Sequence, residues 1–292
     1  MTTTLISALL IGALATLLAT AALGFGAVLV ALAGRATATE PMLPGTRPDG
    51  GPATPSKVGW LGLVLATTLL VAALAIRTVM VGHAPWSTLH EFSVAFATAV
   101  LAVYLALARS YPIAGLAPMV ALLAAGLVGF ALGLDDAADP LVPALQQPLL
   151  LTIHVGSAAL AYAVAGVAFV VAAAELGQRW AHGRIAALPD ADTLRAVGHR
   201  AVLIAFPILT IAIALGSLWA NLAWRSYWSN DPKELAAAAT WLVFGAYLHV
   251  AGRRDRWEAL APWLIVLGFV GVLFTYIGAG IFIVGEHSYG AP

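Results

Sequence analysis

The side chains in this sequence with the clearest capacity for metal chemistry are histidines, because a neutral imidazole binds transition metals through a ring nitrogen. There are seven: His83, His90, His154, His182, His199, His249 and His287. The chain has no cysteine, so disulfides, thiolate metal sites and iron–sulfur clusters are excluded within it. Histidine nitrogens are therefore the candidate ligands.

A second chemical feature is the stretch 216–241, which holds four of the nine tryptophans: Trp219, Trp224, Trp228 and Trp241. Tryptophan is common at membrane interfaces, and Asp231, Pro232 and Glu234 are typical of a capped helix start. Neither reason explains three tryptophans and a tyrosine within ten residues. A dense aromatic shelf suits a large, planar, apolar ligand, because rings offer rigid stacking area.

The composition indicates which elements must position these side chains. Hydrophobic residues make up 61% of the 292 residues, charged residues only 10%, and net charge is zero. A soluble domain carries about 25% charged residues, so we predict an all-α, polytopic integral membrane helical bundle. Because no excess of basic residues exists, we do not expect nucleic acid to be a partner. About eight segments are long and apolar enough to be transmembrane helices: 5–33, 58–76, 91–108, 114–134, 148–176, 201–221, 232–252 and 260–284.

The distribution of basic residues predicts the orientation of these helices. Eleven of the fourteen Lys and Arg residues fall in the odd-numbered loops, which the positive-inside rule places in the cytoplasm. Both termini are then extracytoplasmic. We divide the chain into a first transmembrane helix (1–34), a flexible cytoplasmic linker with five prolines (35–57), and a membrane domain (58–292) whose tryptophan-rich loop, about 216–234, lies outside.

This topology brings four histidines to the outer face. His154 lies ~9 Å along a helix that starts at Pro148, His287 follows the last span, and His83 and His90 lie in an outer loop. A haem iron takes two axial ligands, often imidazoles, so two of these could hold one against the tryptophan shelf. His154 and His287 are one pair; His83 or His90 could substitute, and spacing alone does not choose. The alternative for each of these histidines is that it is only a polar residue at the membrane interface.

His249 differs because it lies ~26 Å beyond Pro232 along its helix, near the inner leaflet. An ionisable residue inside a span is a functional candidate by default. The alternative is a neutral imidazole that bonds to a neighbouring helix.

Several motifs together resemble a known family. The loop WANLAWRSYWSNDPKE is similar to the tryptophan-rich "WWD" signature of haem-handling proteins. The other motifs are IRTVMVGHAPWSTLHE at 76–91, LVPALQQPLLLTIHV at 141–155, YLH at 247–249 and LFTYIGAGIFIVGEHSYG at 273–290. Over about residues 58–290 they resemble the CcsA/ResC family of the system II cytochrome c maturation machinery.

That resemblance implies haem transport across the cell membrane and its ligation to the CxxCH thiols of apocytochrome c. It implies that non-covalent haem b is held outside by His154 and His287 and within the membrane by His249. It also implies haem contacts for Trp219, Trp224, Trp228 and Asp231, while His83 lies in a family motif without an assigned ligand role. The implied partners are a ResB/CcsB-type membrane subunit, which would complete a cytochrome c synthetase and supply the second inner ligand, and a thiol-reducing thioredoxin-like protein.

The loop departs from the family pattern at several positions. Asn230 stands where the family usually has Trp, and Arg225 stands where it has Gly. A guanidinium suits bidentate recognition of carboxylates, so Arg225 is a candidate partner for a haem propionate.

Three other functions compete with this interpretation. A membrane b-type cytochrome in quinone-linked electron transfer would pair histidines at matched depth in facing helices. A small-solute permease would explain the spans but not the clustered aromatic residues. A system I haem-handling protein would share the tryptophan loop, but the GHAP and EHSYG contexts favour system II.

Overall fold

The computed structural model describes residues 2–36, 57–137, 145, 148–251, 259–279, 283 and 285–287. These residues form helices and no strands, as predicted. The elements are α1 (Thr2–Ala36), α2 (Lys57–Val81), α3 (Leu89–Ser110), η1 (Ala114–Leu116), α4 (Ala117–Leu132), α5 (Pro148–Trp180), α6 (Ala191–Trp224), α7 (Pro232–Val250), α8 (Ala261–Leu273) and the π-helical η3 (Phe274–Gly278). Apart from its ends, the predicted linker 35–57 lies outside the described residues.

Seven helical segments are long and apolar enough to cross a membrane, which fits a multi-pass membrane protein. The sequence predicted eight spans, and α7 is the one that these seven do not include. This helix has only 19 residues and carries Lys233 and Glu234 in its first turn. Length and composition therefore do not confirm the count of eight.

Side-chain caps set where two of the helices begin. The Asp190 carboxylate accepts a hydrogen bond from the backbone N–H of Thr193 at 2.8 Å, so α6 starts ten residues before its predicted apolar span. Asp231 caps α7 in the same way, and Glu234 completes the capping box that the sequence predicted.

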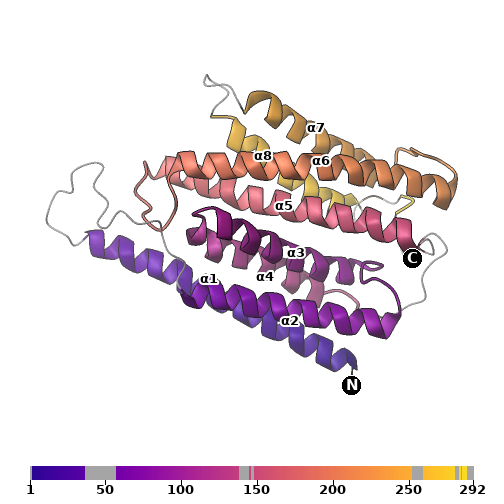
Figure 1. The fold of residues 1–292 in the computed structure, drawn as a ribbon, viewed down its shortest axis with the longest axis horizontal. Helices are drawn as coiled ribbons and strands as arrows, with labels where there is room; N and C mark the ends of the chain where they lie inside the picture. Colours follow the sequence, from indigo (N-terminus) through magenta and orange to yellow (C-terminus); the bar gives the residue numbers. More distant parts are fainter. Residues whose placement is uncertain are drawn as a thin grey trace.

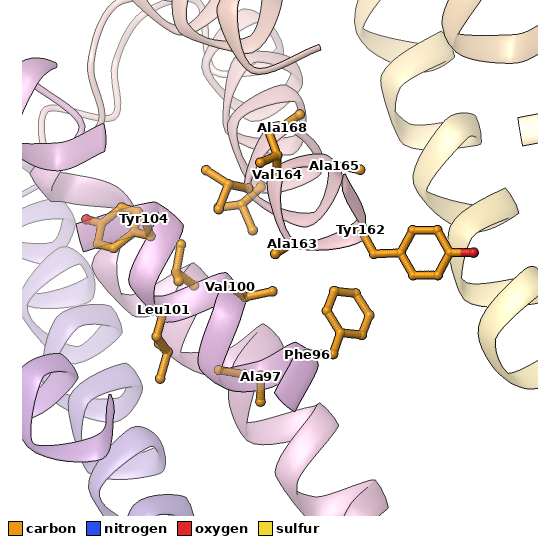
Figure 2. Close-up of a cluster of buried hydrophobic side chains, with 14 of the residues drawn as sticks. Phe96, Ala97, Val100, Leu101, Tyr104, Tyr162, Ala163, Val164, Ala165 and Ala168 are labelled. Carbon is orange, nitrogen blue, oxygen red and sulfur yellow. The ribbon is translucent and has the colours of Figure 1, made fainter. Parts of the chain in front are cut away.

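The middle of the bundle is the long helix α5, which packs along α3, α6 and α8 (Figure 1). The α3–α5 contact is apolar: Phe96 and Val100 of α3 face a side of α5 rich in alanine, including Ala163 (Figure 2). Small side chains let two helix backbones approach closely. Tyr162 lies beside this contact, with its ring centroid 6.1 Å from that of Phe96, and its hydroxyl points toward α8 (Figure 2).

Figure 1 shows that the α2–α3 connection, the start of α5, the α6–α7 loop and the end of α8 share one end of the bundle, here called the tryptophan-loop end. A buried ion pair connects several elements at this end. Arg77 Nε lies 2.8 Å from Glu91 Oε1, and its other nitrogens donate to the carbonyls of Asp136 and Ala137. Glu91 Oε2 accepts from both the backbone N–H and the hydroxyl of Ser87. The pair therefore joins α2, α3 and the segment after α4.

Candidate functional site

A cavity of about 570 Å³ lies at the tryptophan-loop end. Its walls come from the α2–α3 connection, from α3, α5, α6 and η3, from the α6–α7 loop and from the start of α7. The lining residues with aromatic, imidazole or charged side chains are Trp86, Phe92, His154, Tyr162, Trp219, Tyr227, Trp228, Lys233, Glu234, Tyr276 and His287. The cavity falls within the roughly 300–1,000 Å³ of ordinary ligand pockets.

Two histidines 133 positions apart face this one cavity, and each is oriented through its Nδ1. His154 Nδ1 lies 2.9 Å from the carbonyl oxygen of Ala212, and His287 Nδ1 lies 2.8 Å from Asp231 Oδ1. A carbonyl and a carboxylate can only accept, so in each neutral ring Nδ1 carries the proton and donates it. The lone pair of each ring is then on Nε2, the nitrogen that a metal would bind.

Burial favours the neutral form of the His287 ring. Burial lowers the pKa of His287 below its usual value, and this outweighs the opposing effect of Asp231, while the positive charge of Lys233 lowers it further. Burial alone would raise the pKa of the Asp231 carboxyl. The His287 imidazole and the backbone N–H groups of Lys233 and His287 reverse that effect and lower its pKa. At neutral pH the pair is thus a carboxylate that orients a neutral imidazole.

The tryptophans pack around these imidazoles. Trp219 is buried, and its ring lies parallel to that of His154 at 6.1 Å and tilted against that of His287 at 5.6 Å. Trp224 stands edge-on to both Trp219 and His287 at 4.8 and 5.1 Å. Trp228 lines the cavity from the loop and is held by a 2.9 Å bond from its Nε1 to Asn230. One buried indole therefore contacts both histidines.

Two glycines leave the space that His154 and Asp231 occupy. A Cβ on Gly216 would lie 2.7 Å from His154 Cε1, and a Cβ on Gly285 would lie 2.3 Å from Asp231 Oδ2. Real Cβ contacts do not occur at these distances, so larger residues here would move the imidazole or its carboxylate partner.

Other predicted site residues lie outside the cavity wall. His83 bonds through Nδ1 to the carbonyl of Ala84, and buried His90 bonds in the same way to Ala131 on α4. His249 is exposed near the far end of α7, away from the tryptophan-loop end. Arg225 is exposed at the end of α6. Of the four outer histidines, His154 and His287 are those that line the cavity.

The two residues that depart from the family pattern, at positions 225 and 230, both have a left-handed backbone conformation. Arg225 ends α6 with φ of 61°, and Asn230 also has φ of 61°. Left-handed backbone is strained for most residues but accessible to asparagine and easiest for glycine, which is commonly found just after helices. The glycine that the resemblance expects at 225 would therefore suit this turn, and Arg225 adopts the same turn at a cost in strain.

Several residues that line the cavity were not singled out from the sequence, among them Trp86, Lys233 and Tyr276. Trp86 lines the cavity from the α2–α3 connection, although its motif was noted. Lys233 was read only as part of a helix start. Tyr276 belongs to η3, and π-helical turns frequently occur at functional sites. All three lie in stretches that carry the family resemblance: GHAPW, DPKE and LFTYIG.

Two imidazoles suit an iron that already has other ligands. Within the described ranges, no three His, Asp or Glu side chains come together to hold a bare metal ion. A macrocycle that brings four in-plane nitrogens needs only two more donors, and it needs flat apolar walls. The cavity offers both.

The chain is similar in sequence and in fold to known proteins. Residues 86–286 match the family described as "Cytochrome C assembly protein". The cytochrome c biogenesis protein CcsA of Microcystis aeruginosa is 32% identical over 324 aligned residues, covering 91% of this chain and 94% of the relative. The protein of that name from Chlamydomonas reinhardtii is 35% identical over 239 residues, covering 77% and 66%.

A solved structure, "Cytochrome c Heme Lyase CcmF", shares the fold with a TM-score of 0.59 at 20% identity. It covers 93% of this chain, which spans 46% of the length of that structure. The profile match over more than half of the chain and identities above 30% over most of it lead to one conclusion. The chain belongs to the cytochrome c assembly protein family.

Proposed function

We propose that this protein carries haem to the extracytoplasmic face of the cell membrane and presents it to apocytochrome c in system II cytochrome c maturation. The observation that supports this most directly is the pair His154 and His287. Both line one cavity, both have Nδ1 engaged by an acceptor, and both are packed against Trp219. The names of the family and of its relatives refer to cytochrome c assembly and biogenesis, and the name of the similar solved structure refers to a haem lyase.

The residues of the wall fit haem by their chemistry. His154 and His287 would ligate the iron through Nε2, and Trp219 and Trp228 would support the flat faces of the ring. Bound haem b supplies the vinyl groups to which the CxxCH thiols of apocytochrome c add. The chain's own part is positioning: it fixes the ring plane, excludes water and holds both imidazoles neutral. No residue needs to act as general acid or base.

The charge distribution supports the proposed orientation. Basic residues concentrate at the end of the bundle opposite the tryptophan loop: Lys57, Arg109, Arg179, Arg184, Arg195 and Arg200. By the positive-inside rule that end is cytoplasmic, which puts the cavity and both termini outside. With α7 as an eighth span, His249 would lie toward the inner leaflet, where a second haem ligand would come from a ResB/CcsB-type partner.

Purification of the chain with and without its candidate partner tests the proposal. We expect the protein to bind haem with the absorbance spectrum of low-spin, bis-imidazole iron. We expect cells without it to fail to attach haem covalently to apocytochrome c. A preparation that binds no haem would refute the haem function. Reduction of its haem by quinol, without any cytochrome c assembly, would favour a b-type cytochrome.

Replacement of Asp231 should separate its role at the helix from its role at His287. Asp231→Ala removes the cap of α7, at about 0.5–2 kcal/mol, and leaves His287 without its acceptor. Loss of such an outer-shell partner typically weakens metal binding about 10- to 100-fold. Asp231→Asn keeps a good cap but removes the charge. We expect Asn to leave the stability near wild type and still lower haem affinity about tenfold, measured by titration with haem. Equal affinity in wild type and Asp231→Asn would contradict this role.

Gly216→Ala should act on His154 alone. Its new Cβ would lie 2.7 Å from Cε1, so the imidazole must move and its bond to Ala212 must lengthen. We expect haem affinity to fall about tenfold or more, with a change in the spin state seen by absorbance. Gly156→Ala on α5 is the matched control, because its Cβ would meet nothing within 4 Å. If both variants bind haem alike, Gly216 has no part in placing His154.

A further inference from the structure

Lys233 is a cation at the cavity that the arrangement of histidines and tryptophans does not explain. It lies in the first turn of α7, two residues after the carboxylate that orients His287. Among the residues that the structure describes, it is the only Lys or Arg in the cavity wall. The remaining wall is mostly aromatic and aliphatic.

The ammonium of Lys233 makes no hydrogen bond or ion pair within the described part of the chain, although its side chain is only partly exposed. The charge of Asp231 acts on it electrostatically and raises its pKa, but burial outweighs that effect and lowers the pKa. The hydrogen bonds of the two nearby carboxylates go to other groups. Asp231 accepts from the Lys233 backbone N–H and from His287, and Glu234 accepts from Ser229 and from the Asp231 backbone N–H.

A partly buried ammonium in a mostly apolar cavity wall is stabilised by an anionic partner. Taking an ammonium partly out of water costs free energy unless a charged or polar group compensates it. At the cavity, Lys233 thus presents a donor that lacks an acceptor among the described residues, as expected where the occupant brings the acceptor atoms.

We infer that Lys233 is the residue that binds a carboxylate of the cavity's occupant, a propionate if the occupant is haem. This rests on the proposed function for the identity of the ligand. It replaces Arg225, which the sequence suggested for the same task but which is exposed and outside the cavity wall. An ammonium–carboxylate contact here would fix which edge of the ring enters and which edge stays toward the apoprotein.

A comparison of two ligands tests this without any assay of cytochrome assembly. Haem and its dimethyl ester differ at the two carboxyl groups, which are charged in haem and neutral methyl esters in the second ligand, and both are titrated by absorbance in the same detergent. We expect wild type to prefer the free acid about 10- to 100-fold. Lys233→Gln should abolish this preference, because it should weaken binding of the free acid far more than binding of the ester. Lys233→Arg, which keeps the positive charge, should keep the preference for the free acid. Each result is a ratio within one protein, so partition of the ligands into detergent cancels between variants.

The variants keep the fold-determining contacts. The cap of α7 uses the backbone N–H of residue 233 together with Asp231 and Glu234, and none of these changes in Lys233→Gln. Lys57→Gln is the matched control, since Lys57 is an exposed lysine at the opposite end of the bundle; it should behave as wild type. The inference is overturned if Lys233→Gln keeps the preference, if it weakens both ligands equally, or if Arg225→Gln removes the preference instead. If wild type binds both ligands equally, the inference fails while the proposed function stands; if it binds neither, the proposed function itself fails.

Discussion

Single replacement of either cavity histidine by glycine should remove one axial ligand and convert the bound haem from a low-spin to a high-spin spectrum. His154→Gly and His287→Gly each delete an imidazole whose Nδ1 is held by an acceptor, and the described part of the wall has no third imidazole. The loss in affinity should exceed the about 10- to 100-fold that removal of an outer-shell partner causes. Covalent cytochrome c yield in cells should fall with it.

Added imidazole distinguishes a ligand from a structural residue. Glycine leaves a space of the shape of the missing ring, so millimolar imidazole should restore both the low-spin spectrum and the cytochrome c yield. His90→Gly is the comparison, because buried His90 bonds to Ala131 and does not line the cavity. We expect it to reduce stability and to retain the low-spin spectrum. Unchanged spectra in both His154→Gly and His287→Gly would refute ligation by this pair.

The second large effect should come from Arg77→Met. Arg77 and Glu91 are 4% and 1% exposed, and Glu91 would keep a buried charge without its cation. Breaking a buried pair at one partner costs about 3–5 kcal/mol. We expect that loss in the free energy of unfolding, measured with denaturant in detergent. Ser87 is held by Glu91, and Ser87 and Trp86 line the cavity, so haem affinity should fall as well.

A double variant isolates the buried charge as the cause. Arg77→Met with Glu91→Met removes both charges, and well-packed apolar pairs are often as stable as the ion pair they replace. It should therefore recover most of the stability lost in Arg77→Met. Arg179→Met is the matched control at the other end, where Glu175 keeps Arg195 and Arg179 is 28% exposed; it should cost about 1 kcal/mol or less. A double variant as unstable as Arg77→Met would show that packing or the lost hydrogen bonds to Asp136 and Ala137, and not the buried charge, cause the loss of stability.

Short-range patterns in the sequence predicted much of the fold. Apolar length located the helices because a membrane span needs about 20 apolar residues, a property of one window. The cap at Asp231 was predictable for the same reason, since its contacts lie within three residues. The extent of α6 was underestimated because apolarity marks the membrane segment and not the polar turns that extend a helix beyond it.

The site was only partly predictable. The sequence alone determined a helical membrane chain without cysteine ligands, a tryptophan-rich loop and a small set of candidate imidazoles. The tertiary structure decided that His154 and His287 share a cavity while His90 turns to α4, and that Lys233 rather than Arg225 borders it. The reason is physical: composition and capping act through neighbours in the chain, whereas which side chains meet depends on how each helix is rotated and packed against helices far away in sequence.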